Sequence, residues 1–277
     1  MSTSNAGPGN GKLKLAFIGG GTMAEAIIAG VVSRGVADGD SIVVGEPVLR
    51  RREYLSGRYG TRAVADNHSA IDGADIVVIA VKPQQLPEVL EELSGKLNAS
   101  QSLLSIVAGA SMGSISEGAN HAAVIRVMPN TPAQVGMGMT VWTASPEVPE
   151  AHREAAGEMF DSLGIATYVA EEKYLDMSTA LSASGPAYVF LFLESLIDAG
   201  VYMGLPREMA QTLALQTIEG SAALARESAR HPAELRNMVT SPGGTTAEAL
   251  LALEDAGFRA AVMNAVIAAH EKAMELG

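Results

Sequence analysis

Residues Leu15–Ala24 read Leu-Ala-Phe-Ile-Gly-Gly-Gly-Thr-Met-Ala, and this stretch decides the fold of the first part of the chain. Its apolar start, Leu15 to Ile18, predicts a short buried strand, and an apolar helical pattern begins soon after it. Between them, the spacing Gly19-x-Gly21-x-x-Ala24 matches the dinucleotide-binding fingerprint. Gly19 permits a tight turn, Gly21 lets a pyrophosphate approach the backbone, and Ala24 allows close contact between helix and strand.

Glycine-rich turns between a strand and a helix also occur for purely structural reasons, and methyltransferases carry one as well. A methyltransferase is expected to have an acidic residue in the strand before its glycines, whereas this chain has Phe17 and Ile18. A nicotinamide dinucleotide is therefore the favoured ligand. It would lie at the N-terminus of the helix, where the helix dipole favours an anion. The residues predicted to bind it there are Gly19, Gly21, Thr22 and Met23.

The composition excludes several classes of protein. At 277 residues the chain is long enough for two domains, and its net charge of −12 argues against general nucleic-acid binding, which needs a basic surface. The chain has no cysteine, which rules out disulfides, thiolate nucleophiles and cysteine-based zinc sites. Its five histidines show no ligand spacing, so we expect no metal. His121, His152 and His231 lie in polar stretches and are expected at the surface.

Two segments bear on localisation. Residues 1–12 are rich in Ser, Asn and Gly and lack the apolar core of a signal peptide, so we predict a disordered tail. The most apolar later segment, Ala187 to Leu205, is interrupted by Glu194 and Asp198. That interruption favours a buried helix over a membrane span. We therefore expect a soluble, cytoplasmic protein.

Short Val- and Ile-rich runs alternate with helical patterns in the first part of the chain, for example Ile76 to Val81 and Val124 to Met128. Such alternation is typical of a mostly parallel sheet covered on both faces. After Glu172 the strand signals end and long Ala- and Leu-rich helices follow. We predict an α/β fold with a dinucleotide-binding domain over 13–172 and an all-α domain over 173–277. These helices are too apolar for one small bundle to bury, which predicts an oligomer.

Charged residues after the second predicted strand bear on the choice of cofactor. Glu46 lies where an acidic residue can hydrogen-bond the adenosine ribose, which favours NAD. Arg50, Arg51 and Arg52 follow, and arginine can instead bind the 2′-phosphate of NADP. A run of charges is more often a solvated helix face. The choice between NADH and NADPH stays open, with Glu46 and Arg50 as the predicted contacts.

Small and polar residues follow later strands at the sheet edge where α/β proteins bind ligands. Lys82 is expected to position the nicotinamide or the phosphates rather than to act as a catalytic residue. The loop Met128-Pro129-Asn130-Thr131-Pro132 is held by its prolines, and it is either a stiff connection or the floor of the pocket. The cofactor-binding residues predicted in these loops are Ala80, Val81, Lys82, Pro83, Ala108 and Gly109.

A second candidate anion site lies near the C-terminus, in Ser241-Pro242-Gly243-Gly244-Thr245-Thr246. Thr245 and Glu248 have the spacing of a capping box, which predicts a helix start. The two glycines allow backbone N–H groups to converge on one point beside several hydroxyls. An ordinary capped loop is the alternative, but the clustering of glycines and hydroxyls favours an anion site. No Ser-His-Asp arrangement or carboxylate pair stands out, so hydride transfer is the chemistry expected.

Together, several motifs follow the order seen in pyrroline-5-carboxylate reductases, and the chain resembles that family from about Lys14 onward. The Ser-Pro-Gly-Gly-Thr-Thr stretch is the most specific of them, whereas many dehydrogenases share the glycine fingerprint. The other matching motifs are Phe17 to Ala24, Ala80 to Pro83, Met128 to Pro132, Ser184 to Tyr188 and Phe258 to Ala261.

The resemblance implies reduction of Δ1-pyrroline-5-carboxylate to L-proline by NADPH or NADH, the last step of proline synthesis. It also implies an N-terminal Rossmann-like domain and a helical domain that forms an intertwined dimer, often assembled into a ring of dimers. The segment with Glu46 and Arg50 departs from the family's commoner pattern of small polar residues, which leaves cofactor preference in doubt.

Site residues are carried over from the family by position. The resemblance implies that Thr246 is the catalytic residue and that its hydroxyl points at the ring nitrogen. Asn67 corresponds to an asparagine that contacts the cofactor, and Glu172 to a residue near the substrate pocket. The implied substrate-binding residues are Ser241, Gly243, Gly244, Thr245, Thr246 and Glu172.

Two other functions stay open from the sequence. A β-hydroxyacid dehydrogenase or imine reductase shares the glycine-rich start and the helical second domain. Those enzymes usually carry a lysine on the long helix, and Ala187 to Tyr202 contains none. A regulator that binds NAD(P) without turnover would bind the cofactor but would show no substrate-dependent oxidation.

Overall fold

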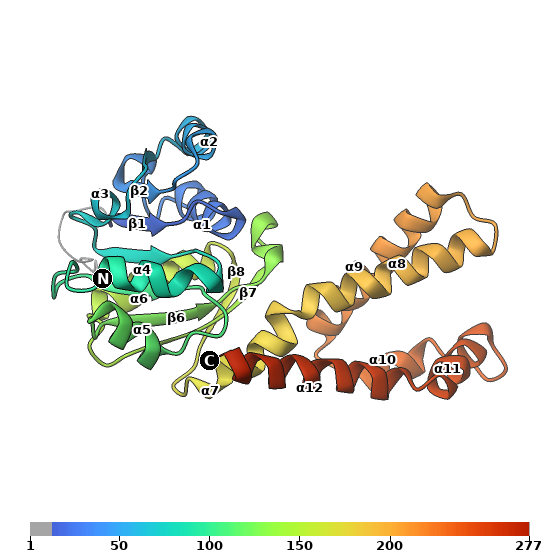
Figure 1. Ribbon diagram of the computed structural model, residues 1–277. Coiled ribbons are helices and arrows are strands. Elements are labelled where there is room, and N and C mark those ends of the chain that lie inside the picture. Colours follow the sequence, from blue (N-terminus) through green and yellow to red (C-terminus); the bar gives the residue numbers. More distant parts are fainter. Residues whose placement is uncertain (1–12, 277) are drawn as a thin grey trace, which may run out of the picture. The chain divides into compact units, whose positions relative to one another are not determined.

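The computed structural model describes residues 13–276, which form two compact units (Figure 1). The first unit runs to Ala183 and also takes in the chain from Ala269 onward, and the second is Ser184–Ala268. The predicted tail, residues 1–12, lies outside the described residues. The predicted domain boundary at 172/173 stays a prediction.

An eight-stranded sheet forms the centre of the first unit, in the order β3-β2-β1-β4-β5-β6-β7-β8. All neighbouring strands are parallel except β6 and β7, which are antiparallel. This confirms the mostly parallel α/β sheet. The strands are β1 (Leu15–Ile18), β2 (Ile42–Gly45), β3 (Arg62–Val64), β4 (Ile76–Ile79), β5 (Ser102–Ser105), β6 (Val124–Met128), β7 (Gly138–Ala144) and β8 (Gly164–Tyr168).

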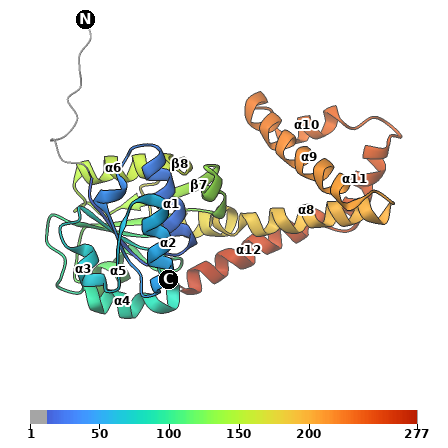
Figure 2. The same ribbon diagram turned by 90° about the horizontal axis from the view of Figure 1, so that it is seen from above.

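Helices cover both faces of this sheet (Figure 2). They are α1 (Thr22–Ser33), α2 (Leu49–Tyr59), α3 (Asn67–Ile71), α4 (Leu86–Leu93), α5 (Met112–Ala119), α6 (Glu150–Asp161) and α7 (Lys173–Ser178). Short 3-10 turns are η1 (Gly39–Ser41), η2 (Pro83–Gln85) and η3 (Thr131–Val135), and a π-helix, η4 (Thr179–Ala183), follows α7.

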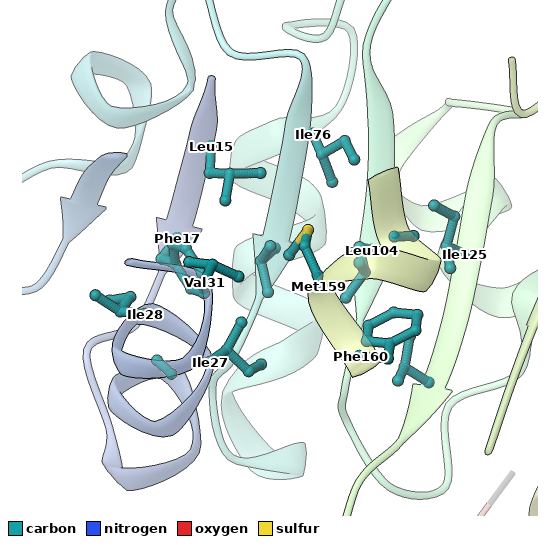
Figure 3. Packing of buried hydrophobic residues seen from close by; sticks show 14 of the residues in the cluster. Leu15, Phe17, Ile27, Ile28, Val31, Ile76, Leu104, Ile125, Met159 and Phe160 are labelled. Carbon is teal, nitrogen blue, oxygen red and sulfur yellow. The ribbon is translucent and has the colours of Figure 1, made fainter. Parts of the chain in front are cut away.

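The alternation of side chains along β1 explains why both faces need a cover. Phe17 joins a hydrophobic cluster with residues of α1 and α6, including Ile28 and Phe160 (Figure 3). Ile18, its neighbour, points to the other face and joins a cluster with residues of α3, α4 and α5, such as Ile115. A strand buried on both faces reads as a continuous apolar run, which is why the sequence revealed it.

The second unit is all helical, as predicted. Its helices are α8 (Gly185–Tyr202), α9 (Arg207–Ser228), α10 (Pro232–Met238), α11 (Thr245–Asp255) and α12 (Phe258–Leu276), the last of which continues into the first unit. Helix α10 was not predicted. Its start carries a recognisable signal, because Pro232 occupies the first turn and the Nδ1 of His231 accepts a bond from the N–H of Ala233.

The expectation that the apolar segment beginning at Ala187 is a buried helix is wrong for the single chain. Only Gly200 is buried in α8, whereas Phe190 and Leu191 are 60% and 66% exposed. The segment Lys173–Tyr202 is also the one described helix that is long and apolar enough to cross a membrane by length and composition alone. Helix α9 covers part of α8, because Gly200 brings it close to Ala210. Other large apolar side chains of α8, such as Leu196, are exposed as well.

Of the three histidines expected at the surface, only one is exposed. His231 is exposed, but His121 and His152 are half-buried. The Nε2 of His121 lies 2.8 Å from the carbonyl of Gln101, and the Nδ1 of His152 lies 2.8 Å from the hydroxyl of Ser102. The sequence could not show these partners because they come from residues far along the chain.

Burial lowers the pKa of His152, and the negative charge of Asp75 opposes that shift only in part. The unfolded chain therefore takes up a proton near pH 6.5, about the ordinary imidazole value, while the folded chain still resists it. We expect stability to fall as the pH drops below that value, and His152→Asn to weaken this loss. Urea unfolding midpoints at about pH 7.5 and about pH 5.5 measure it. An equal loss in the variant and the wild type would contradict the assignment.

Candidate active site

The ends of three strands meet at the first glycine turn. The N–H of Gly19 donates to the carbonyl of Gly45 at the end of β2 (2.8 Å), and Ala80 donates to Ile18 (2.9 Å). Gly19 has a φ of +93°, and an added Cβ would lie 2.7 Å from the carbonyl oxygen of Ala80. This turn therefore requires glycine, as predicted, for a conformation and a close approach that L-residues rarely allow.

Gly21 has a different role in the same turn. It precedes the first residue of α1 with an ordinary φ of −68°, and no side chain caps this helix end. An added Cβ at Gly21 would meet nothing within 4 Å. The space in front of the first N–H groups of α1 is therefore open. An anion such as a pyrophosphate fits there, so the residues present suit the dinucleotide that the fingerprint implies.

Glu46 binds the turn directly. One carboxylate oxygen accepts a hydrogen bond from the N–H of Gly20 (3.0 Å), and the other accepts one from the N–H of Val48 (2.9 Å). The side chain is half-buried. Glu46 thus lies at the end of β2 beside the glycine turn, where the sequence placed it, and it also holds that turn.

The arginine run divides into separate roles. Arg51 donates to the carbonyl of Gly20 and pairs with Glu25 (2.6 Å), and Arg52 donates to the carbonyl of Glu46 (2.7 Å). Both side chains hold the glycine turn and the end of β2 in place, so the interpretation of the run as a solvated helix face is wrong for these two. Arg50 is exposed, and its side chain makes no hydrogen bond or ion pair within residues 13–276. It is the member of the run that remains available to a ligand.

Asn67 begins α3 and lies over the end of β2. Its Nδ2 donates to the carboxylate of Glu92 (2.6 Å), and an added Cβ at Gly45 would lie 2.7 Å from its Oδ1. The close approach requires a small residue at Gly45, and it places Asn67 at the same sheet edge as the glycine turn. Its predicted contact with the cofactor stays a prediction.

The loops after β4 and β5 lie at neighbouring strand ends, because these strands pair in parallel. Ala80 and Val81 are half-buried, whereas Lys82 is exposed and its side chain has no partner in the described part of the chain. Gly109 has a φ of +76°, and Leu276 of α12 packs against it. A pocket of about 550 Å³ opens here, lined by Pro83, Leu86, Pro87, Leu90, Glu91, Ser94, Val107, Ala108, Gly109, Ala110, Ser114, Gly118 and Leu276.

In the second unit, the predicted anion loop is a tight turn before α11. Gly243 has a φ of +66°, and the N–H of Gly244 donates to the carbonyl of Ser241 (3.0 Å). The helix starts at Thr245 as predicted, but the capping box is wrong. Gly244 occupies the cap position and no side chain caps the helix, because the tight turn brings glycine, not threonine, to that place.

The hydroxyls around this turn are available. Ser241 and Thr245 are exposed and Thr246 is half-buried. None of the three side chains has a hydrogen-bond partner among residues 13–276. An uncapped helix end with adjacent hydroxyls can bind a small carboxylate, since both kinds of donor are unpaired.

Glu172 is already engaged within the first unit. Its carboxylate accepts hydrogen bonds from the guanidinium of Arg126 (2.8 Å) and from the N–H of Met112 (2.7 Å). Arg126 was missed in the sequence, although a lone arginine inside the run Val124-Ile-Arg-Val-Met128 was a signal. The sequence left open whether the loop of Asn130 is a stiff connection or the floor of the pocket. In the structure Asn130 donates to Ser182 and accepts from the N–H of Met139.

Two further features describe the ligands that the chain can hold. Within residues 13–276, no group of three or more His, Cys, Asp or Glu side chains is arranged to hold a metal ion. The helix starts of α1 and α11, neither of which has a side-chain cap, lie in different compact units. Each follows a turn in which a glycine has positive φ.

Known proteins match almost the whole chain. Residues 172–276 match the family described as pyrroline-5-carboxylate reductase dimerisation, and residues 14–109 match NADP oxidoreductase coenzyme F420-dependent. The pyrroline-5-carboxylate reductase of Synechocystis sp. is 44% identical over 265 residues, which is 96% of this chain and 98% of the relative. That of Escherichia coli K12 is 38% identical over 264 residues, or 95% and 98% of the two chains.

A solved structure agrees with these relatives. The crystal structure of Plasmodium falciparum pyrroline carboxylate reductase with NADP bound superposes with a TM-score of 0.88 at 36% identity, covering 96% of this chain and 98% of the other. The resemblance seen in the motifs is thereby confirmed, and the helical part is confirmed as a dimerisation domain. The chain belongs to the pyrroline-5-carboxylate reductase family.

Proposed function

We propose that this protein reduces 1-pyrroline-5-carboxylate to L-proline with NADPH or NADH, the last step of proline biosynthesis. As a member of its family it is an NAD(P)H-dependent oxidoreductase that acts on a C=N bond. The observation that carries the assignment to particular residues is the pair of uncapped helix ends after glycine turns. The end of α1 suits a pyrophosphate, and the end of α11 suits a small carboxylate flanked by hydroxyls.

The reduced nicotinamide would supply the hydride when it is bound. The carboxylate of the substrate is held by the hydroxyl of Ser241 and by the N–H groups of Gly243, Thr245 and Thr246, since that of Gly244 donates to the carbonyl of Ser241. These contacts fix the ring in place. Thr246 directs its hydroxyl at the ring nitrogen. A cyclic imine accepts hydride best when it is protonated at nitrogen, and a neutral hydroxyl can orient that nitrogen without a shifted pKa. Positioning of this kind can supply several kcal/mol of the barrier.

Oxidation of the reduced cofactor, followed at about 340 nm with 1-pyrroline-5-carboxylate present, tests the proposal. We expect oxidation that depends on the substrate and forms proline in equal amount. Cofactor binding without oxidation would support a regulator instead. Oxidation with β-hydroxyacid substrates, or with other imines only, would support the dehydrogenase or imine reductase alternative.

Cofactor preference rests on Glu46 and Arg50 in this proposal. Glu46→Gln should raise the ratio of kcat/KM for NADPH over NADH about tenfold, because a carboxylate repels a 2′-phosphate. Arg50→Gln is the paired variant, and it should lower that ratio if Arg50 binds the phosphate. Steady-state kinetics with both cofactors measures both ratios. Unchanged ratios in both variants would show that neither Glu46 nor Arg50 selects the cofactor.

The chain forms an oligomer through its helical part, since those residues match a dimerisation domain. We propose a homodimer, assembled further into a ring of dimers, in the cytoplasm and without nucleic-acid or membrane partners. The exposed apolar side chains of α8, such as Phe190 and Leu191, and the net charge of −12 support this. The mass of the assembly in solution, measured by light scattering, tests it.

A further inference from the structure

Arg126 is the one charged side chain that is buried among residues 13–276. It lies in the middle of β6, and its side chain is only 2% exposed. A buried charge is costly unless it is paired and hydrogen-bonded. Replacing a buried ion pair by apolar residues of similar volume is often neutral or stabilising, so stability alone does not account for this arginine.

The two arms of the guanidinium hold the segment that follows β8. One nitrogen lies 2.8 Å from Glu172 and the other 2.7 Å from Asp176. These carboxylates are one helical turn apart at the start of α7, where two like charges would repel each other without the arginine. Arg126 thus fixes the position and the rotation of α7 against the sheet.

Glu172 extends the same contact to the loop after β5. The carboxylate oxygen that pairs with Arg126 also accepts a hydrogen bond from the N–H of Met112 (2.7 Å), the first residue of α5. The loop just before it contains Ala108 and Gly109, which are predicted to bind the cofactor. One oxygen therefore joins β6, α7 and the loop at the cofactor edge of the sheet.

A second attachment lies ten residues further along the same segment. The Nδ2 of Asn130, in the loop after β6, lies 3.3 Å from both the carbonyl and the hydroxyl of Ser182 in the π-helix η4. The Oδ1 of Asn130 accepts from the N–H of Met139 (2.9 Å), which holds the amide in place. The segment from Glu172 to Ser182 is therefore tied at both ends to β6 and the loop that follows it.

We propose that Arg126 is a positioning residue for hydride transfer, which it serves by fixing Glu172, and through it the loop at Ala108 and Gly109 and the segment that leads into α8. This inference rests on the proposed function. Arg126 touches neither cofactor nor substrate in this account. Its removal should misplace the reacting groups without removing any group that binds them.

Arg126→Met keeps the length and the apolar stem of the side chain and removes its charge. We expect kcat to fall at least about tenfold per folded molecule, while the Kd of NADPH changes less than about threefold. The kinetic isotope effect with NADPH deuterated at the transferred hydrogen should rise, because hydride transfer becomes slower relative to other steps. Arg126→Lys should recover part of kcat, since one ammonium cannot span both carboxylates.

Arg153→Met is the matched control. Arg153 is a half-buried arginine of α6 that donates to the carbonyl of Ser145 (2.7 Å) and contacts none of the predicted site residues. It should lose stability but keep the kcat and the isotope effect of the wild type. If Arg126→Met does not fold, Arg126→Lys decides the question. Wild-type kcat and isotope effect in the folded Arg126 variant would overturn the proposal, whereas failure of the proposed function would appear as an inactive wild type.

Discussion

Replacement of Thr246 by alanine should lower kcat for 1-pyrroline-5-carboxylate more than about tenfold and leave the Kd of the cofactor nearly unchanged. Thr246 is the second residue of α11, half-buried, and its hydroxyl has no partner within residues 13–276. In our proposal that hydroxyl orients the ring nitrogen. Its loss removes an interaction with the substrate ring and leaves the separate glycine turn of α1 untouched.

Thr246→Ser is the matched variant for this test. Serine keeps the hydroxyl and removes only a methyl group, so it should retain most of the activity. Steady-state kinetics gives kcat and KM, and quenching of protein fluorescence by NADPH gives its Kd. Full activity of the alanine variant would remove Thr246 from the mechanism. Equal losses in both variants would assign the effect to packing rather than to the hydroxyl.

Alanine at Gly21 should weaken cofactor binding about tenfold or more without a loss of stability. Gly21 has a φ of −68°, which alanine adopts readily, and an added Cβ would have no neighbour within 4 Å. The methyl group would instead occupy the space that we assign to the pyrophosphate. Titration with NADPH and urea unfolding measure the two effects separately.

Alanine at Gly19 should, in contrast, lower the stability of the protein. Its φ of +93° and the 2.7 Å approach of an added Cβ to the carbonyl of Ala80 make any side chain strained. We expect a loss of stability of about 1–3 kcal/mol, seen as a lower urea midpoint. A stable Gly19→Ala protein would contradict the described turn, and normal NADPH binding by Gly21→Ala would contradict the assigned anion site.

The sequence predicted best what depends on neighbouring residues. The strand at Leu15, the turn at Gly19 and the helix from Thr22 were all found because their signals lie within ten positions of one another. The start of α11 was found for the same reason. Its cap was not, because which residue occupies the cap position depends on the left-handed turn at Gly243.

Features that depend on distant partners escaped the sequence. The ion pairs of Arg126 join residues 46 and 50 positions apart, and no local pattern announces them. The burial of α8 was misjudged because a helix as apolar as this one can be covered by its own chain or by another copy. The apolar composition predicted an oligomer, but it did not show which helix is left exposed, and the exposure of Phe190 identifies α8 as one of them.

The carboxylate of Glu46 holds the N–H of Gly20 at the same place where it would discriminate between nucleotides. A substitution of Glu46 that changes the cofactor preference therefore also removes a hydrogen bond from the glycine turn that binds the cofactor. A redesign that starts from Arg50, whose guanidinium supports nothing else in the described chain, avoids that conflict. Cofactor selectivity and loop rigidity are coupled at Glu46 and separable at Arg50.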